Sequence, residues 1–123
     1  MAHVTELQKY LTRQWHWSKK VFGPGLRTSG IIAHIKSELD EIEANPHDLS
    51  EWIDVIILAL DGYWRHGGTG HMLQKLLQEK QDRNFARDWP PYTGDDAPVF
   101  HLEPGTPIQL RLPFEDPDAV SLS

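Results

Sequence analysis

Four acidic residues in the middle of the chain have the types and the spacing to bind metal ions. Glu38 and Glu41 form an ExxE pair, and Glu51 and Asp54 form an ExxD pair that follows after a short connection. Residues three apart lie on one face of a helix. Two helices joined by so short a connection should run antiparallel, so both pairs meet at one end of the hairpin. Carboxylate oxygens gathered in this way suit Mg²⁺ or Mn²⁺.

Each half of this pattern also has an ordinary explanation. Glu pairs at this spacing are common on solvated helix faces, and Glu51 can instead complete a capping box with Asp48, unless Ser50 is the cap. The position of Asp54 favours the metal site, because its neighbours in the segment from Trp52 to Leu60 are all apolar. A buried carboxylate is costly unless it is paired or bound to a cation.

A group of complementary charge lies further along the chain. Lys80, Asn84 and Arg87 share one face of an expected helix, and Lys and Arg are the usual partners of phosphate. Beside Glu79 and Asp82 the same face could simply be solvated. Together with a carboxylate site for metal ions, these residues predict a phosphate ester or anhydride as the substrate.

Four helices are expected to position these residues. Apolar residues recur at helical spacing, and Gly, Pro and capping residues separate the segments, which cover about residues 4–20, 28–44, 49–66 and 70–88. The connections are short, so the fold class is predicted to be all-α, a four-helix bundle with antiparallel neighbours. The third segment is apolar nearly all round, which is typical of a helix buried in a bundle.

Proline marks the end of the helical part. Seven of the nine prolines fall at or after Pro90, so we expect a helical domain over residues 1–90 and a Pro-rich C-terminal extension over 91–123. Within the extension, residues 99–102 and 108–112 alternate as strands do. A small β-hairpin and an extended arm on another subunit are both compatible with this pattern.

Composition excludes several classes of function. The chain of 123 residues has no cysteine, which rules out disulfides, zinc–thiolate sites and a cysteine nucleophile. Its net charge of −6 argues against a surface that binds a nucleic-acid polymer. The longest apolar run, Val55 to Leu60, is too short to span a membrane, and the N-terminus does not read as a signal peptide. We therefore expect a cytoplasmic protein, in the host cytoplasm if a phage encodes it.

The paired motifs resemble those of the all-α nucleoside triphosphate pyrophosphatases, the superfamily of MazG and the dimeric dUTPases. Longer strings are similar to a phage and prophage dATP/dGTP diphosphohydrolase group, which includes enzymes from viruses whose DNA carries 2-aminoadenine. These strings occupy residues 22–25, 34–42, 51–54, 58–65, 80–84 and 87–90.

The resemblance implies a MazG-like bundle that hydrolyses purine deoxynucleoside triphosphates, dGTP and dATP, to the monophosphate and pyrophosphate. The four carboxylates would hold two or more Mg²⁺ or Mn²⁺ ions, with Glu38 or Glu41 as the catalytic base. Lys80, Asn84 and Arg87 would contact phosphate. The dGMP formed would feed synthesis of a 2-aminoadenine nucleotide, and we expect a homodimer or homotetramer.

Three further residues are candidates for contact with the nucleobase. Trp15 or Phe22 could stack on it, and His34 could hydrogen-bond to it or orient a carboxylate. Each could equally be an ordinary packing residue. Three alternative functions also stay open: a pyrimidine-specific enzyme such as a dUTPase or dCTPase, a non-catalytic metal-dependent nucleotide-binding module, and a purely structural bundle.

Overall fold

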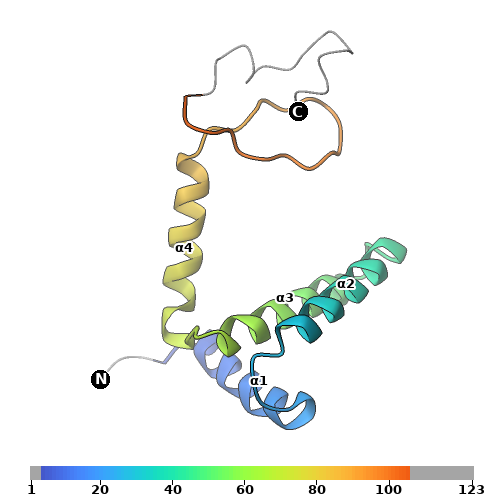
Figure 1. The fold of residues 1–123 in the computed structure, drawn as a ribbon, viewed down its shortest axis with the longest axis vertical. Helices are drawn as coiled ribbons and strands as arrows, with labels where there is room; N and C mark the ends of the chain where they lie inside the picture. Colours follow the sequence, from blue (N-terminus) through green and yellow to red (C-terminus); the bar gives the residue numbers. More distant parts are fainter. Residues whose placement is uncertain (1–3, 106–123) are drawn as a thin grey trace. The chain divides into compact units, whose positions relative to one another are not determined.

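The computed structural model describes residues 4–105, so the predicted strand over residues 108–112 lies outside the described part. Figure 1 shows the helices, which are α1 (Glu6–Phe22), α2 (Thr28–Ala44), α3 (Leu49–Arg65) and α4 (Gly70–Ala86). Residues 4–105 contain no strand, and β pairing there is limited to an isolated antiparallel bridge between Asp88 and Leu102. The predicted all-α class is confirmed.

The ends of α1 follow from local capping. The Thr5 hydroxyl accepts a hydrogen bond from Gln8 N at 3.1 Å, and Thr5 N donates to Gln8 Oε1 at 2.6 Å. This capping box starts the helix two residues later than predicted. At the other end, Gly23 has a φ of 91°, which a residue with a side chain rarely adopts. The helix therefore ends at Phe22, directly before this glycine, and is two residues longer at this end than predicted.

The connection between α2 and α3 is as short as predicted. Asn45 ends α2 immediately before Pro46, and Asp48 is the N-cap of α3, where its Oδ1 accepts hydrogen bonds from Ser50 N at 3.0 Å and Ser50 Oγ at 2.6 Å. Ser50 is thus not the cap. With this tight turn, α2 and α3 lie side by side and antiparallel (Figure 1).

Helix α1 packs across α3, and a small apolar core lies between the elements. Its buried apolar members are Leu11, Ile31, Ile42, Leu58 and Leu73. The expectation that α3 is buried all round is wrong for the single chain. Leu49, Trp52, Ile53 and Ile56 are each at least 50% exposed. Only the opposite side of α3 faces α1 and α2.

The chain forms two compact units that divide between Leu77 and Gln78. The first contains α1, α2, α3 and the start of α4. In the second, Leu102 N donates to Asp88 O at 2.7 Å, which closes the segment after α4. The domain boundary at residue 90 stays a prediction. No helix in the described range is long and apolar enough to cross a membrane.

Candidate active site

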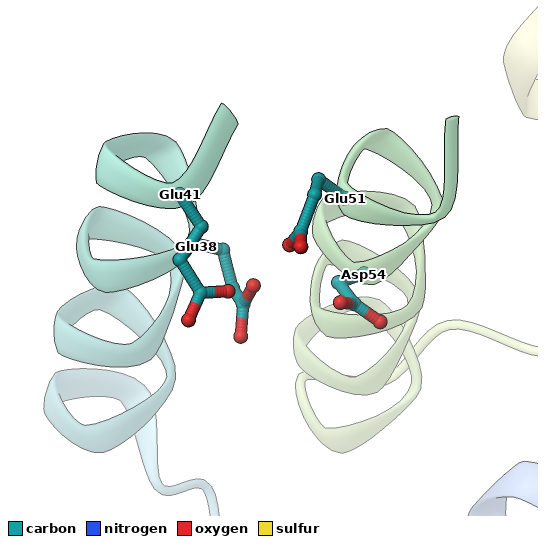
Figure 2. Close-up of side chains that lie close together, drawn as sticks. All are labelled: Glu38, Glu41, Glu51 and Asp54. Atoms are coloured by element: carbon teal, nitrogen blue, oxygen red, sulfur yellow. The ribbon is translucent and has the colours of Figure 1, made fainter. Parts of the chain in front are cut away.

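The four predicted carboxylates meet across the α2–α3 hairpin. Glu38 and Glu41 project from α2 toward Glu51 and Asp54 on α3 (Figure 2). One oxygen from each of the four residues can be chosen so that all lie within 4.8 Å of one another. The predicted convergence follows from the helical spacing within each motif and from the short connection between the helices.

Two oxygens of this cluster lack a hydrogen-bond partner in the part of the chain that the structure describes. Glu38 Oε2 and Glu51 Oε2 are buried and have no hydrogen-bond partner among the described residues. A buried polar atom without a partner loses its hydration and gains nothing in return, which makes it unfavourable. The cluster is therefore incomplete as a purely protein structure.

Electrostatic repulsion acts on the same groups. The pKa of Glu38 is raised, first by a hydrogen bond shared with Glu41, then by burial, then by the negative charges of Glu41 and Asp54. His34 opposes this shift, and its Nε2 lies 3.3 Å from Glu38 Oε1. His34 thus contacts a carboxylate of the cluster directly, as one of the two predicted roles requires.

Burial is the largest cause of the raised pKa of Glu51, followed by a hydrogen bond with Glu41 and by neighbouring negative charges. The carboxylate of Glu51 belongs to this cluster rather than to the cap of α3. Crowded carboxylate oxygens without compensating positive charge are a donor set for hard divalent cations. The cluster can hold a metal ion.

A cavity of about 490 Å³ opens beside the carboxylates. Glu38 and Asp54 lie in its wall. Aromatic rings form another part of the wall: Trp17 and Phe22 pack edge to face with centroids 5.5 Å apart, and Phe22 packs in the same way on His34 at 6.3 Å. The size is typical of a small-molecule site. The cavity combines a charged part with a flat apolar part.

The three residues predicted to contact the base do not all lie in the same cavity. Phe22 and His34 line the cavity beside the carboxylates. Trp15 does not, because it points to a separate cavity of about 210 Å³, where its ring lies 5.6 Å from that of Trp64. The structure thus brings Phe22 and His34 to the site and leaves Trp15 elsewhere.

Sequence reasoning missed one side of the cavity, which α1 provides. Tyr10, Arg13, Gln14 and Trp17 all line it. Their spacing of i, i+3, i+4 and i+7 places them on one helix face. Because this face mixes polar and aromatic residues, an apolar stripe does not identify it. The sequence signal that could have identified this face is the helical spacing that the four residues share.

The predicted phosphate ligands belong to the second unit. Arg87 Nη1 donates to Asn84 Oδ1 at 3.1 Å, and Lys80 lies exposed on α4. Asn84 and Arg87 are thus brought together as predicted from their shared face. Their contact with phosphate stays a prediction.

A buried polar network lies among α1, the following loop and α3. Asp61 accepts hydrogen bonds from Ser18 Oγ at 2.9 Å and from Arg65 Nε at 2.7 Å. Arg65 also donates to the carbonyl oxygens of Gly23 and Gly25 at 3.0 and 2.9 Å. Asp61 shares a helix face with Glu51 and Asp54 in sequence, but it is neutralised here by Arg65 and does not belong to the carboxylate cluster.

The chain is all-α, and its four carboxylates face one another across a helical hairpin, beside a cavity large enough for a nucleotide. These are the features of an all-α nucleoside triphosphate pyrophosphatase. The family model for dATP/dGTP pyrophosphohydrolase matches residues 10–102. The chain belongs to this family, and the resemblance noted from its motifs is confirmed at that level. No match was found among curated proteins or among solved structures.

Proposed function

We propose that this protein hydrolyses dGTP and dATP between the α and β phosphates, and that it requires Mg²⁺ or Mn²⁺ held by Glu38, Glu41, Glu51 and Asp54. The observation that carries the proposal is the carboxylate cluster in the wall of an aromatic-lined cavity. The family of the chain supports the same reaction. A nucleotide placed with its phosphates at the cluster has room for its base against the aromatic rings.

The metal ions, when bound, would neutralise phosphate charge and acidify water. The role of the chain is to take a proton from the attacking water and to orient the triphosphate. Glu38 or Glu41 is the proposed base. Water adds its oxygen to the α phosphorus, the bond between that phosphorus and the bridging oxygen breaks, and pyrophosphate leaves. Lys80, Asn84 and Arg87 are the proposed contacts for the phosphates.

We further propose that the chain works as a homodimer or homotetramer. Leu49, Trp52, Ile53 and Ile56 share one face of α3, at i, i+3, i+4 and i+7 spacing, and each is at least 50% exposed. An apolar helix face of this kind is typical of an interface. In light scattering, the wild type should have at least twice the mass of one chain, and Ile56→Glu should lower that mass.

The product would have a specific use if a phage encodes this chain. The dGMP would supply synthesis of a 2-aminoadenine nucleotide, and the reaction would take place in the host cytoplasm, where the deoxynucleotide pool lies. Comparing dGTP with dATP addresses this proposal, because a dGMP-supplying enzyme should prefer dGTP.

The test is a panel of all deoxynucleoside triphosphates with Mn²⁺ or Mg²⁺, with products separated by anion exchange. We expect dGMP or dAMP together with pyrophosphate. In water labelled with heavy oxygen, the label should enter the monophosphate, because attack at the α phosphorus leaves the new oxygen there. Label in the pyrophosphate, or release of dGDP and orthophosphate, would contradict the proposed reaction.

The same panel separates the alternatives. Preferred hydrolysis of dUTP or dCTP would favour a pyrimidine-specific enzyme. Tight binding of dGTP without turnover would favour a binding module. Glu38→Gln provides the control for contaminating activity, since a true signal should disappear with this variant.

A further inference from the structure

Gln14 is a buried amide in the wall of the cavity beside the carboxylates. Its residue exposure is only 7%, although neighbouring positions on α1 are exposed. Amide side chains are seldom buried to this degree unless both ends of the amide form hydrogen bonds. Each end of the Gln14 amide therefore needs an explanation.

The amino end is accounted for. Gln14 Nε2 donates to the carbonyl oxygen of Ile57 on α3 at 2.6 Å. A backbone carbonyl can only accept, so the group facing it must be the amino group and not the amide oxygen. This contact therefore determines which way the amide points, and it leaves Oε1 as a hydrogen-bond acceptor of known identity.

The oxygen end has no hydrogen-bond partner in the described part of the chain. Gln14 Oε1 is buried and makes no hydrogen bond within residues 4–105. Gln14 and Ile57 both line the cavity, together with Phe22 and His34. A buried acceptor of fixed orientation, in the wall of a cavity, is suited to a donor that arrives with the ligand.

We propose that Gln14 is a specificity-determining residue whose Oε1 accepts a hydrogen bond from an N–H group of the purine base. This inference rests on the proposed function, in which the phosphates of the same nucleotide lie at Glu38 and Asp54. Adenine offers its 6-amino group, and guanine offers its ring N–H and its 2-amino group. A base without such a donor leaves Oε1 buried and unpaired, which costs binding free energy.

Nucleotide analogues test this directly. The 6-deamino analogue of dATP has the same shape but lacks the amino group, and dITP is dGTP without its 2-amino group. For wild-type protein we expect kcat/KM for pyrophosphate release to fall by about 10- to 100-fold from dATP to its 6-deamino analogue. For guanine, a fall from dGTP to dITP would identify the 2-amino group as the donor, and an equal rate would identify the ring N–H.

The substitution Gln14→Leu removes the acceptor and keeps a side chain of similar length. It should bring the ratio of kcat/KM for dATP and the 6-deamino analogue close to one. If Gln14 served only to join α1 to α3 through Ile57, both substrates would lose activity equally, and an unchanged ratio would overturn the proposal. Gln14→Met is a second variant should the first fail to fold, as judged by circular dichroism.

Gln8→Leu is the matched control. Gln8 lies on the same helix and also carries an amide side chain. Its Oε1 accepts a hydrogen bond from Thr5 N, and Gln8 does not line the cavity. This variant should lower stability and leave the substrate ratio as in the wild type. If wild-type protein hydrolyses dATP and its 6-deamino analogue equally well, the role of Gln14 is refuted while the proposed function stands. If it hydrolyses none of the four nucleotides, the proposed function fails and the role of Gln14 with it.

Discussion

Arg65 Nε donates a hydrogen bond to Asp61 Oδ1 at 2.7 Å, one helical turn earlier on α3. Both residues are buried, with exposures of 8% for Arg65 and 2% for Asp61. Through Ser18 and the carbonyl oxygens of Gly23 and Gly25, the pair also joins α1 and the loop after it to α3. Since Phe22 immediately precedes this loop, the pair supports one wall of the cavity.

Neutralising Asp61 should therefore destabilise the fold. In Asp61→Asn the guanidinium of Arg65 stays buried without its counter-charge, and breaking a buried pair in this way costs about 3–5 kcal/mol. Urea denaturation followed by tryptophan fluorescence measures the loss. Asp40→Asn, an exposed change on α2, is the control and should shift the free energy of unfolding by less than about 0.5 kcal/mol. Equal effects of both variants would argue against the network.

Removing a cluster carboxylate should abolish the response to metal while the fold is kept. Metal that binds only the folded state raises the melting temperature. For Glu38→Gln and Asp54→Asn we expect little or no rise with Mn²⁺, a metal-free melting temperature equal to or above that of the wild type, and a loss of turnover of about 100-fold or more. Differential scanning fluorimetry with and without Mn²⁺ provides the readout.

Glu43→Gln is the matched control for that experiment. Glu43 is an exposed glutamate on α2 that lies outside the cluster. This variant should retain the metal-induced rise and the turnover of the wild type. A rise that survives in Glu38→Gln but not in Glu43→Gln would place the metal elsewhere.

The metal-free protein should gain stability as the pH falls from neutrality. The pKa values of Glu38 and Glu51 are raised above 4.5 in the folded chain, so the folded state takes up protons before the unfolded state does. The free energy of unfolding then increases as the pH falls through these raised values, and the gain levels off near 4.5, where the unfolded chain is protonated too. Denaturation in EDTA over this range should show a weaker pH dependence for Glu38→Gln.

Phe22 and Trp15 should respond differently to truncation. Phe22 lines the cavity beside the carboxylates, and Trp15 lines the other one. Loss of a ring that stacks on a base costs about 1–3 kcal/mol, so Phe22→Ala should raise KM for dATP and dGTP by about 10- to 100-fold. Trp15→Ala should lower the melting temperature and leave KM nearly unchanged. Steady-state kinetics on both variants measures these changes in KM. A larger rise in KM for Trp15→Ala than for Phe22→Ala would contradict the assignment of Phe22 to the base.

Much of the fold could be predicted because its signals are local. The starts of α2 and α4 and the end of α2 fall where Thr28, Gly70 and Asn45 indicated. The errors were small and had local causes: the Thr5 capping box delayed α1, and Gly23 allowed it to extend to Phe22. The exposed face of α3 was misjudged because apolar composition alone does not say whether the covering surface belongs to the same chain.

The carboxylate cluster was determined by the sequence itself. Helical spacing places Glu38 beside Glu41 and Glu51 beside Asp54. Because the connection between α2 and α3 is short, the two helices run antiparallel and the two pairs face each other. The cavity depends instead on how α1 crosses α3, which no local spacing encodes. Gln14 meets Ile57, and Ser18 meets Asp61, each across 43 residues of sequence. Only the packing of distant helices could bring a buried amide, an aromatic wall and the carboxylates together.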